Sequence, residues 1–432
     1  MAGTEEPLWR ELSGWRGAEG AKTFPYDAVI DHLREVGKHF LSPRLLALLD
    51  TCRQSLAERT GEGDTYLARF LDVLLDKYDG SYDYPSYTGL PLFQQSAPEP
   101  AEPAGNWTAT RHRRDRLVLL LLADLIEFEQ LVLDGTPADP QGALPDPALL
   151  GKRLRLAVRV MEPAALRVLD SAVDPVSVAA TPGRTPARPL AMAVLAAAAD
   201  EERLLLRTSV QPVYVLHDEY LFLRVLQTFE TTFAFMSRTL DAAVRALTGE
   251  QPGDAATLIA SVADVLRESL PLFSLLATMQ PESFQVFRQY TDGASAIQSE
   301  GYKTFETYCS TPARARLDSP AFTAVPRVRE AVLAGRETVQ GTWEDVVASG
   351  WLTEQDAGAV RAAARQLEAV HQRWKQTHYR LAVRMIGERT GTGSTEGVPY
   401  LKSVIANRLF PAVQSGPSPV AGPALEQQPA AG

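Results

Sequence analysis

Cysteine and histidine are scarce in this chain, which has 2 cysteines and 6 histidines among 432 residues. Cys52 and Cys309 are too few for a disulfide framework and have no CxxC spacing, which fits a reducing cytoplasm. The histidines form no HExxH motif, no ExxH pair and no cluster with cysteine. The sequence therefore argues against a disulfide-rich secreted domain and against a zinc or di-iron centre.

Long apolar segments, a basic surface and nucleotide-binding motifs are also missing. The longest apolar run, Leu117–Ala123, is too short to cross a bilayer, and the acidic N-terminus has no hydrophobic signal segment. The net charge of −10 argues against a nucleic-acid-binding surface. No Walker A or GxSxG motif occurs, and Gly391–Ser394 follows a predicted helix instead of opening one. We expect a cytoplasmic protein whose partner is a small molecule, with neither nucleic acid nor a membrane as partner.

Helical periodicity dominates the chain, and no series of alternating β-branched strands occurs. Pro-rich segments interrupt the helical pattern and suggest region boundaries. The Tyr-, Gly- and Pro-rich segment Lys77–Phe93 is predicted to be an ordered irregular loop that packs against the main domain. We predict an all-α fold with an N-terminal helical region (1–110), a middle helical region (111–204), a third helical domain (205–411) and a disordered tail (412–432).

The segment from Trp374 to Gly397 carries the most informative pattern. It is a helix-forming run with one histidine, His378, on an apolar face, and a Gly/Thr/Ser loop follows it. A single helical imidazole can ligate a haem iron, and a loop of small residues can close over the edge of a flat cofactor. Apolar residues on the same face would form the wall beside the imidazole. Basic residues nearby could meet the haem propionates: Arg373, Lys375, Arg380 and Arg384.

Three sequence blocks follow one another in the C-terminal half. They are HDEYLFLRVLQTFETTF (217–233), LATMQPESFQVFRQYTDGASAIQS (276–299) and WKQTHYRLAVRMIGERTGTGSTEGVPYLKS (374–403). In this order they resemble the tryptophan 2,3-dioxygenase family of haem proteins. The resemblance implies a helical-bundle haem domain of that type over 205–411, with an additional N-terminal helical region before it. It further implies haem b as cofactor, O₂ as co-substrate and a homo-oligomer, either a dimer or a tetramer.

The resemblance assigns roles to residues of the second and third blocks. His378 would be the axial ligand of the haem iron, with Trp374 and Gly393 beside the cofactor. Arg288 would pair with the carboxylate of an aromatic amino-acid substrate, because a planar guanidinium matches a carboxylate bidentately. Thr392 would bind the ammonium or carboxylate of the same substrate.

On the distal side of the haem, the resemblance places Ser295, and it assigns Phe222 to the wall around the substrate ring. The family has a distal histidine in a THQ triplet, which contacts the indole N–H. The matching triplet here has Leu226 in that position, and leucine cannot accept a hydrogen bond. The family also has an N-terminal tyrosine-bearing segment that closes a neighbour's active site, for which Phe24–Asp27 is the candidate match.

Three functional hypotheses follow. The leading one is a haem-dependent oxygenase that acts on L-tryptophan or a modified indole amino acid in secondary metabolism, by ring cleavage or by diverted chemistry. The second is a haem-dependent hydroxylase of a non-indole aromatic amino acid, which the loss of the indole partner at Leu226 motivates. The third is a non-catalytic haem-binding sensor or scaffold, against which the retained Arg288 and Thr392 argue.

Overall fold

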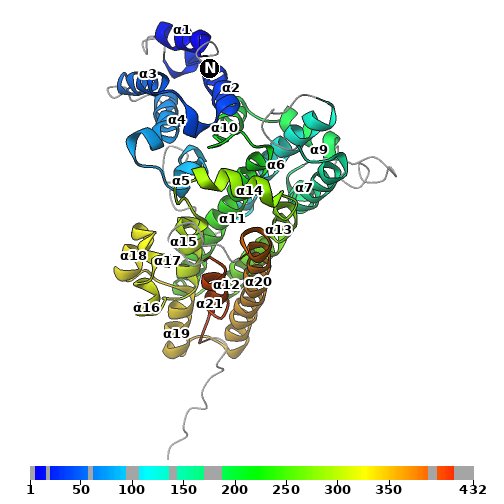
Figure 1. Cartoon of the computed structure of the whole chain (residues 1–432). Helices are drawn as coiled ribbons and strands as arrows, with labels where there is room; N and C mark the ends of the chain where they lie inside the picture. The colour runs from blue at the N-terminus through cyan, green and yellow to red at the C-terminus, as the bar shows by residue number, and fades with distance from the viewer. Residues whose placement is uncertain are drawn as a thin grey trace, which may run out of the picture.

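The structure is a computed structural model that describes residues 5–15, 20–56, 62–93, 107–135, 144–169, 187–387 and 397–412. Every regular element in these ranges is a helix, which confirms the predicted all-α class (Figure 1). All of the predicted disordered tail except residue 412 lies outside the described residues. None of the described helices is long and apolar enough to cross a membrane.

Residues 5–93 form a module of short helices, here called the N-terminal module. It has its own buried core, in which Trp15, Phe24 and Phe70 are in edge-to-face contact. Phe24 and Tyr26 belong to this core, so the candidate match at Phe24–Asp27 does not supply a tyrosine to the pocket of its own chain. The elements are α1 (Glu6–Gly14), η1 (Ala21–Thr23), α2 (Tyr26–Val36), η2 (Lys38–Phe40), α3 (Pro43–Gln54), α4 (Glu62–Asp79), α5 (Tyr84–Tyr87) and η3 (Leu90–Phe93).

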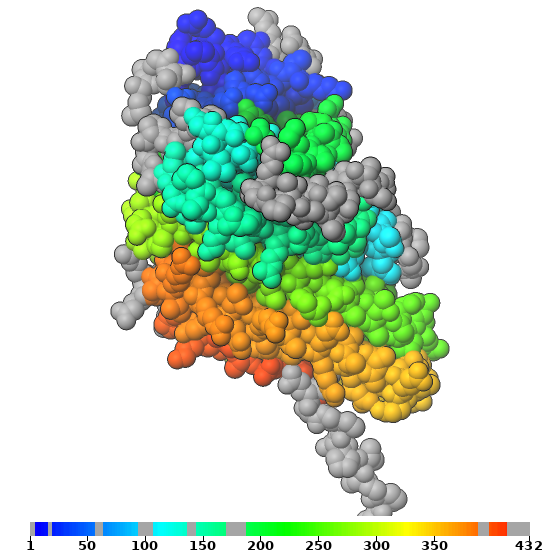
Figure 2. All heavy atoms as spheres, turned by 90° about the vertical axis from the view of Figure 1, so that its right-hand side faces the viewer, coloured from blue at the N-terminus to red at the C-terminus, as the bar shows by residue number. Residues whose placement is uncertain are grey.

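Most of the described chain after residue 93 shares one large buried core with α5, and this core extends to residue 410. Figure 2 shows the N-terminal module in blue above the central helices, with α20 in orange along the lower part of that face. The central helices are α6 (Trp107–Leu133), α7 (Pro147–Val168), α9 (Ala187–Ala196), α10 (Asp200–Thr208), α11 (His217–Thr248), α12 (Pro252–Ser269), α13 (Pro271–Leu276) and α14 (Pro281–Phe287).

Most of the C-terminal elements contribute to this core, while buried side chains between Leu317 and Val332 form a small separate cluster. The C-terminal elements are η4 (Arg288–Tyr290), η5 (Ala296–Gln298), α15 (Glu300–Cys309), α16 (Arg314–Leu317), α17 (Pro320–Thr323), α18 (Pro326–Leu333), α19 (Val339–Ser349), α20 (Glu354–Ile386) and α21 (Val398–Val404). Helix α20 packs against α12, and α12 packs against α11. The proposed boundary at residue 204 stays a prediction, because side chains on both sides of it contribute to one core.

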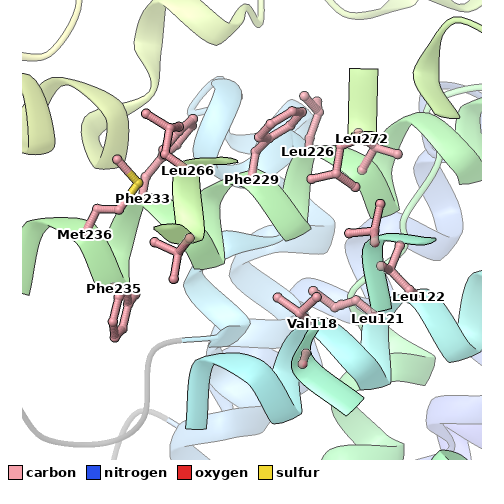
Figure 3. Close-up of a cluster of buried hydrophobic side chains, with 14 of the residues drawn as sticks. Val118, Leu121, Leu122, Leu226, Phe229, Phe233, Phe235, Met236, Leu266 and Leu272 are labelled. Atoms are coloured by element: carbon pink, nitrogen blue, oxygen red, sulfur yellow. The ribbon is translucent and has the colours of Figure 1, made fainter. Parts of the chain in front are cut away.

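Helices α11 and α20 are the long elements that position the pocket described below. Figure 3 shows Leu226, Phe229 and Phe233 projecting from one side of α11, while α6 contributes Val118 and Leu121 on its other side. The hydroxyl of Thr353 accepts a hydrogen bond from the amide of Asp356 at 3.1 Å, which caps the start of α20. The helix ends at Gly387, whose φ of 64° favours glycine.

The N-terminal module is tightly seated on the segment before α11. Gly89 has a φ of +68°, and a Cβ there would lie 2.6 Å from the carbonyl oxygen of Ser209. Gly37 has a φ of +84° and a similar close approach to Val213. Lys77 donates to the carbonyl of Tyr290 at 2.8 Å and pairs with Asp292. The predicted packing of segment Lys77–Phe93 against the main domain is confirmed by these contacts and by the place of α5 in the main core. The prediction of an irregular loop was wrong for much of the segment, because the end of α4, α5 and η3 lie within it.

Candidate functional site

One pocket gathers residues from α5, α11, α13, α14, η4, η5, α15, α20 and α21. The volume of its cavity is about 270 Å³. Its walls are mostly apolar and contain many aromatic rings, and flat rings of this kind suit a flat, apolar ligand. The aromatic side chains of the wall are Tyr84, Tyr87, Phe222, Phe229, Phe233, Phe273, Phe284, Phe287, Tyr302, Trp374 and Tyr400.

The predicted site residues that the structure describes all line this one pocket. They come from three segments that are far apart in the sequence, so the fold itself brings them together. Thr392 and Gly393 lie outside the described residues. The six residues that line the pocket are Phe222, Leu226, Arg288, Ser295, Trp374 and His378.

His378 lies on α20 between two aromatic rings. The ring of Phe273 stacks on it at 5.7 Å between centroids, and Trp374 lies at 5.4 Å. Burial lowers the pKa of His378 to about 4, so the imidazole is neutral near pH 7 and retains a lone pair. Among the described residues it has no hydrogen-bond partner, and a neutral imidazole held in this way is suited to bind a metal ion or an iron-containing cofactor.

The predicted basic rim around His378 is only partly found. Arg373, Arg380 and Arg384 are exposed and do not line the pocket. The reason is the helical period, which turns these positions away from the face of α20 that carries His378. Lys375 does line the pocket, but it donates to backbone carbonyls at the end of α21, including that of Ile405 at 2.9 Å.

A charged cluster that the sequence reasoning missed lies at another part of the pocket wall. Lys303 donates to Glu306 at 3.1 Å, and Arg316 pairs with the same carboxylate. Burial would raise the pKa of Glu306, but Lys303 and Arg316 outweigh it and lower that pKa to about 2. The spacing of Lys303 and Glu306 in YKTFE, directly after the second block, could have indicated one helical face.

A second missed group joins the N-terminal module to α11. The hydroxyl of Tyr84 donates to Oε1 of Glu230 at 2.9 Å, and Ser299 also hydrogen-bonds to this carboxyl group. Burial raises the pKa of Glu230 to about 7, while the two hydrogen bonds oppose that rise. Tyr84, Glu230 and Ser299 all line the pocket. The signal in the sequence was the tyrosine-rich DYPSY motif, whose partner could not be read from its spacing.

The pocket residues fit a haem group. His378 offers a neutral imidazole, aromatic rings provide flat walls, and the cationic side chains of Arg288, Lys303 and Arg316 can balance carboxylates. The Nε1 atom of Trp374 is buried beside His378 and has no hydrogen-bond partner among the described residues. Within these residues there is no group of three or more His, Cys, Asp or Glu side chains that could hold a bare metal ion. An iron held by its own macrocycle needs only the single protein ligand found here.

Together the fold and the pocket define a helical-bundle protein with an apolar pocket that is rich in aromatic rings. Curated relatives named tryptophan 2,3-dioxygenase match about half of the chain. The protein from Polaromonas naphthalenivorans is 28% identical over 236 residues, which cover 47% of this chain and 84% of the relative. The protein from Bordetella parapertussis is 27% identical over 238 residues (47% and 83%), and that from a Nocardioides species is 27% identical over 222 residues (45% and 82%).

No family model matches the chain. The relatives nevertheless confirm the resemblance to the tryptophan 2,3-dioxygenase family that was inferred from the three sequence blocks.

Proposed function

We propose that this protein is a haem-dependent oxygenase that uses O₂ to oxidise an aromatic amino acid, with L-tryptophan or a modified indole amino acid as its leading substrate. The observation that carries the proposal is the pocket itself, in which His378, Arg288 and Phe222 come together from three matching segments. The relatives are named for tryptophan oxidation, which is consistent with this chemistry.

Haem b, when bound, supplies the ferrous iron that activates O₂. In this proposal His378 holds the iron, with its ring fixed between Phe273 and Trp374. Gly393, which is not among the described residues, would lie beside the cofactor. The buried aromatic walls exclude water, which protects the reactive centre from side reactions.

The substrate is held by groups of this chain and not activated by them. Arg288 would take the substrate carboxylate and Thr392 its ammonium or carboxylate, while Phe222 packs on the ring. Such an orienting clamp supplies most of what a protein must add when the cofactor provides the oxidant. Ser295 would lie on the distal side of the haem.

Leu226 favours a departure from simple tryptophan cleavage. Its side chain lines the pocket and keeps 9% of its surface accessible, so this part of the wall offers no acceptor for an indole N–H. The proposal therefore includes a ring-substituted indole substrate, a diverted outcome such as mono-oxygenation or rearrangement, and a role in secondary metabolism. The same observation favours the second candidate, a haem-dependent hydroxylase of a non-indole aromatic amino acid.

The third candidate, a haem-binding sensor or scaffold, is disfavoured by Arg288 in the pocket, because a gas sensor needs no carboxylate clamp. A cytoplasmic location and a homo-oligomer, either a dimer or a tetramer, stay predictions from the sequence.

The test is a spectral titration of the haem-loaded protein. We expect the wild type to show a Soret band. The band should be absent in His378→Ala and present in His371→Gln. His371 is the matched control, because it is a buried neutral imidazole on the same helix that does not line the pocket. L-tryptophan should shift the band of the wild type, and turnover in air should give an oxygenated product by mass spectrometry. A protein that stays colourless after haem supplementation would refute the proposal.

A further inference from the structure

A polar group interrupts the aromatic face that α11 turns toward the pocket. Leu226, Phe229, Glu230 and Phe233 follow one another at helical spacing, and all four line the cavity. Glu230 retains 6% of its surface accessible, which is similar to the accessible share of its apolar neighbour Leu226. A carboxyl group is therefore presented among rings that would contact a substrate by apolar packing alone.

Two hydroxyl groups hold this carboxyl group in place, and a glycine makes room for it. The hydroxyl of Tyr84, from α5 of the N-terminal module, donates to Oε1 at 2.9 Å. The hydroxyl of Ser299 bonds to the same carboxyl group, while its oxygen accepts from the amide of Tyr302 at 3.0 Å. A Cβ at position 301 would lie 2.7 Å from Oε2, so glycine at that position makes room for the carboxyl group.

Glu230 has hydrogen-bonding capacity that these partners do not use. A carboxyl group has about four acceptor positions, and the two hydroxyl groups occupy about two of them. Glu230 has no cationic partner among the described residues. A buried carboxyl group without a cation is costly, and a donor that enters from the pocket would reduce this cost.

We propose that Glu230, positioned by Tyr84, is a specificity-determining residue that accepts a hydrogen bond from a hydroxyl group on the aromatic ring of the substrate. This inference rests on the proposed function of the pocket and narrows its substrate class to phenolic or hydroxyindole amino acids. Leu226 lies one turn earlier on α11, about 6 Å along the helix axis, and offers no acceptor. The ring donor is thus bound at Glu230 and not at Leu226.

The test compares matched ligand pairs by Soret titration of the haem-loaded full-length protein. The pairs are L-tyrosine with L-phenylalanine and 5-hydroxy-L-tryptophan with L-tryptophan. In the wild type we expect the hydroxylated member of each pair to bind about 10-fold tighter, as for one hydrogen bond of about 1.4 kcal/mol to a buried acceptor. Glu230→Leu should reduce this preference to about twofold or less without weakening the unsubstituted ligand. Tyr84→Phe, which leaves the carboxyl group in place, should reduce it in part.

Glu219→Gln is the matched control, because Glu219 is a buried acid on α11 that accepts from Tyr87 and does not line the pocket. This variant should retain the preference. If the ligands bind the wild type without preference, or if the preference persists in both Glu230→Leu and Tyr84→Phe, the inference is wrong while the proposed function stands. A loss of haem in Glu230→Leu would assign the residue to the cofactor and also overturn the inference. If no aromatic amino acid shifts the Soret band of the wild type, the proposed function itself fails.

Discussion

Replacing Arg288 by methionine tests which cation binds the substrate carboxylate. Arg288 begins η4 and is only partly buried, whereas Lys303 is buried and committed to Glu306. A charge-assisted hydrogen bond contributes about 1.5–3 kcal/mol, which corresponds to a change in Kd of about 10- to 100-fold. We therefore expect Arg288→Met to weaken L-tryptophan binding by that factor.

The matched ligand is tryptamine, which has the same ring and ammonium group but lacks the carboxylate. If Arg288 binds the carboxylate, the Kd of tryptamine should be about the same in the wild type and in Arg288→Met. A purely structural effect of the substitution would weaken both ligands equally. The measurement is a Soret titration of each haem-loaded protein with each ligand.

Lys303→Met is the matched control variant. It leaves the buried Glu306 with Arg316 as its remaining partner, so the cost should be below the roughly 3–5 kcal/mol of a buried charge that loses its only partner. We expect a clearly lower unfolding midpoint and no selective loss of L-tryptophan over tryptamine. The opposite pattern, with a selective loss in Lys303→Met and none in Arg288→Met, would refute the assignment of Arg288 and move the carboxylate to the Lys303 cluster.

Further outcomes are expected for stability and for the pocket. Burial lowers the pKa of His371 to about 3 from an ordinary 6.5, so its neutral form stabilises the fold above pH 6.5 and this contribution is lost as the pH falls toward 3. The free energy of unfolding of the apoprotein should fall by about 2–3 kcal/mol between pH 7 and pH 4.5 because of this group. In His371→Gln the free energy of unfolding should fall less steeply with pH. Gly89→Ala should lower the unfolding midpoint more than Gly80→Ala, because both have positive φ but only Gly89 meets a backbone oxygen; equal effects would contradict the close approach. Leu226→His should tighten L-tryptophan binding in Soret titrations, and an unchanged Kd would leave position 226 without a role at the ring. Lys77→Met should weaken L-tryptophan more than tryptamine, since Lys77 holds the backbone at Tyr290 beside Arg288; equal weakening would contradict that role.

The sequence predicted the helical class and the residues that meet in the pocket, because its informative signals are local. An apolar helical face around His378 follows from the period of 3.6 residues, and the blocks carry the resemblance in a fixed order. The same period also shows why the predicted basic rim was wrong at Arg373, Arg380 and Arg384. These positions lie on the opposite face of α20, which could have been read from the spacing.

The missed residues depend on contacts between distant segments. Tyr84 and Glu230 are separated by 146 positions, and no periodicity in either segment identifies the other as its partner. The cluster of Glu306 and Arg316 likewise depends on how the chain turns between α15 and α16. Such pairings are set by tertiary packing, which a single sequence does not display.

The N-terminal module is therefore part of the pocket and not only an appended domain. Its α5 contributes Tyr84 and Tyr87 to the wall, and its Lys77 holds the backbone that follows Arg288. The rings of Tyr214 and Tyr290 stack at 5.0 Å and 12°, and this pair meets Phe40 of the module, which fixes the same segment from another side. A chain that supplies these groups to its own pocket needs no neighbouring subunit to close that wall.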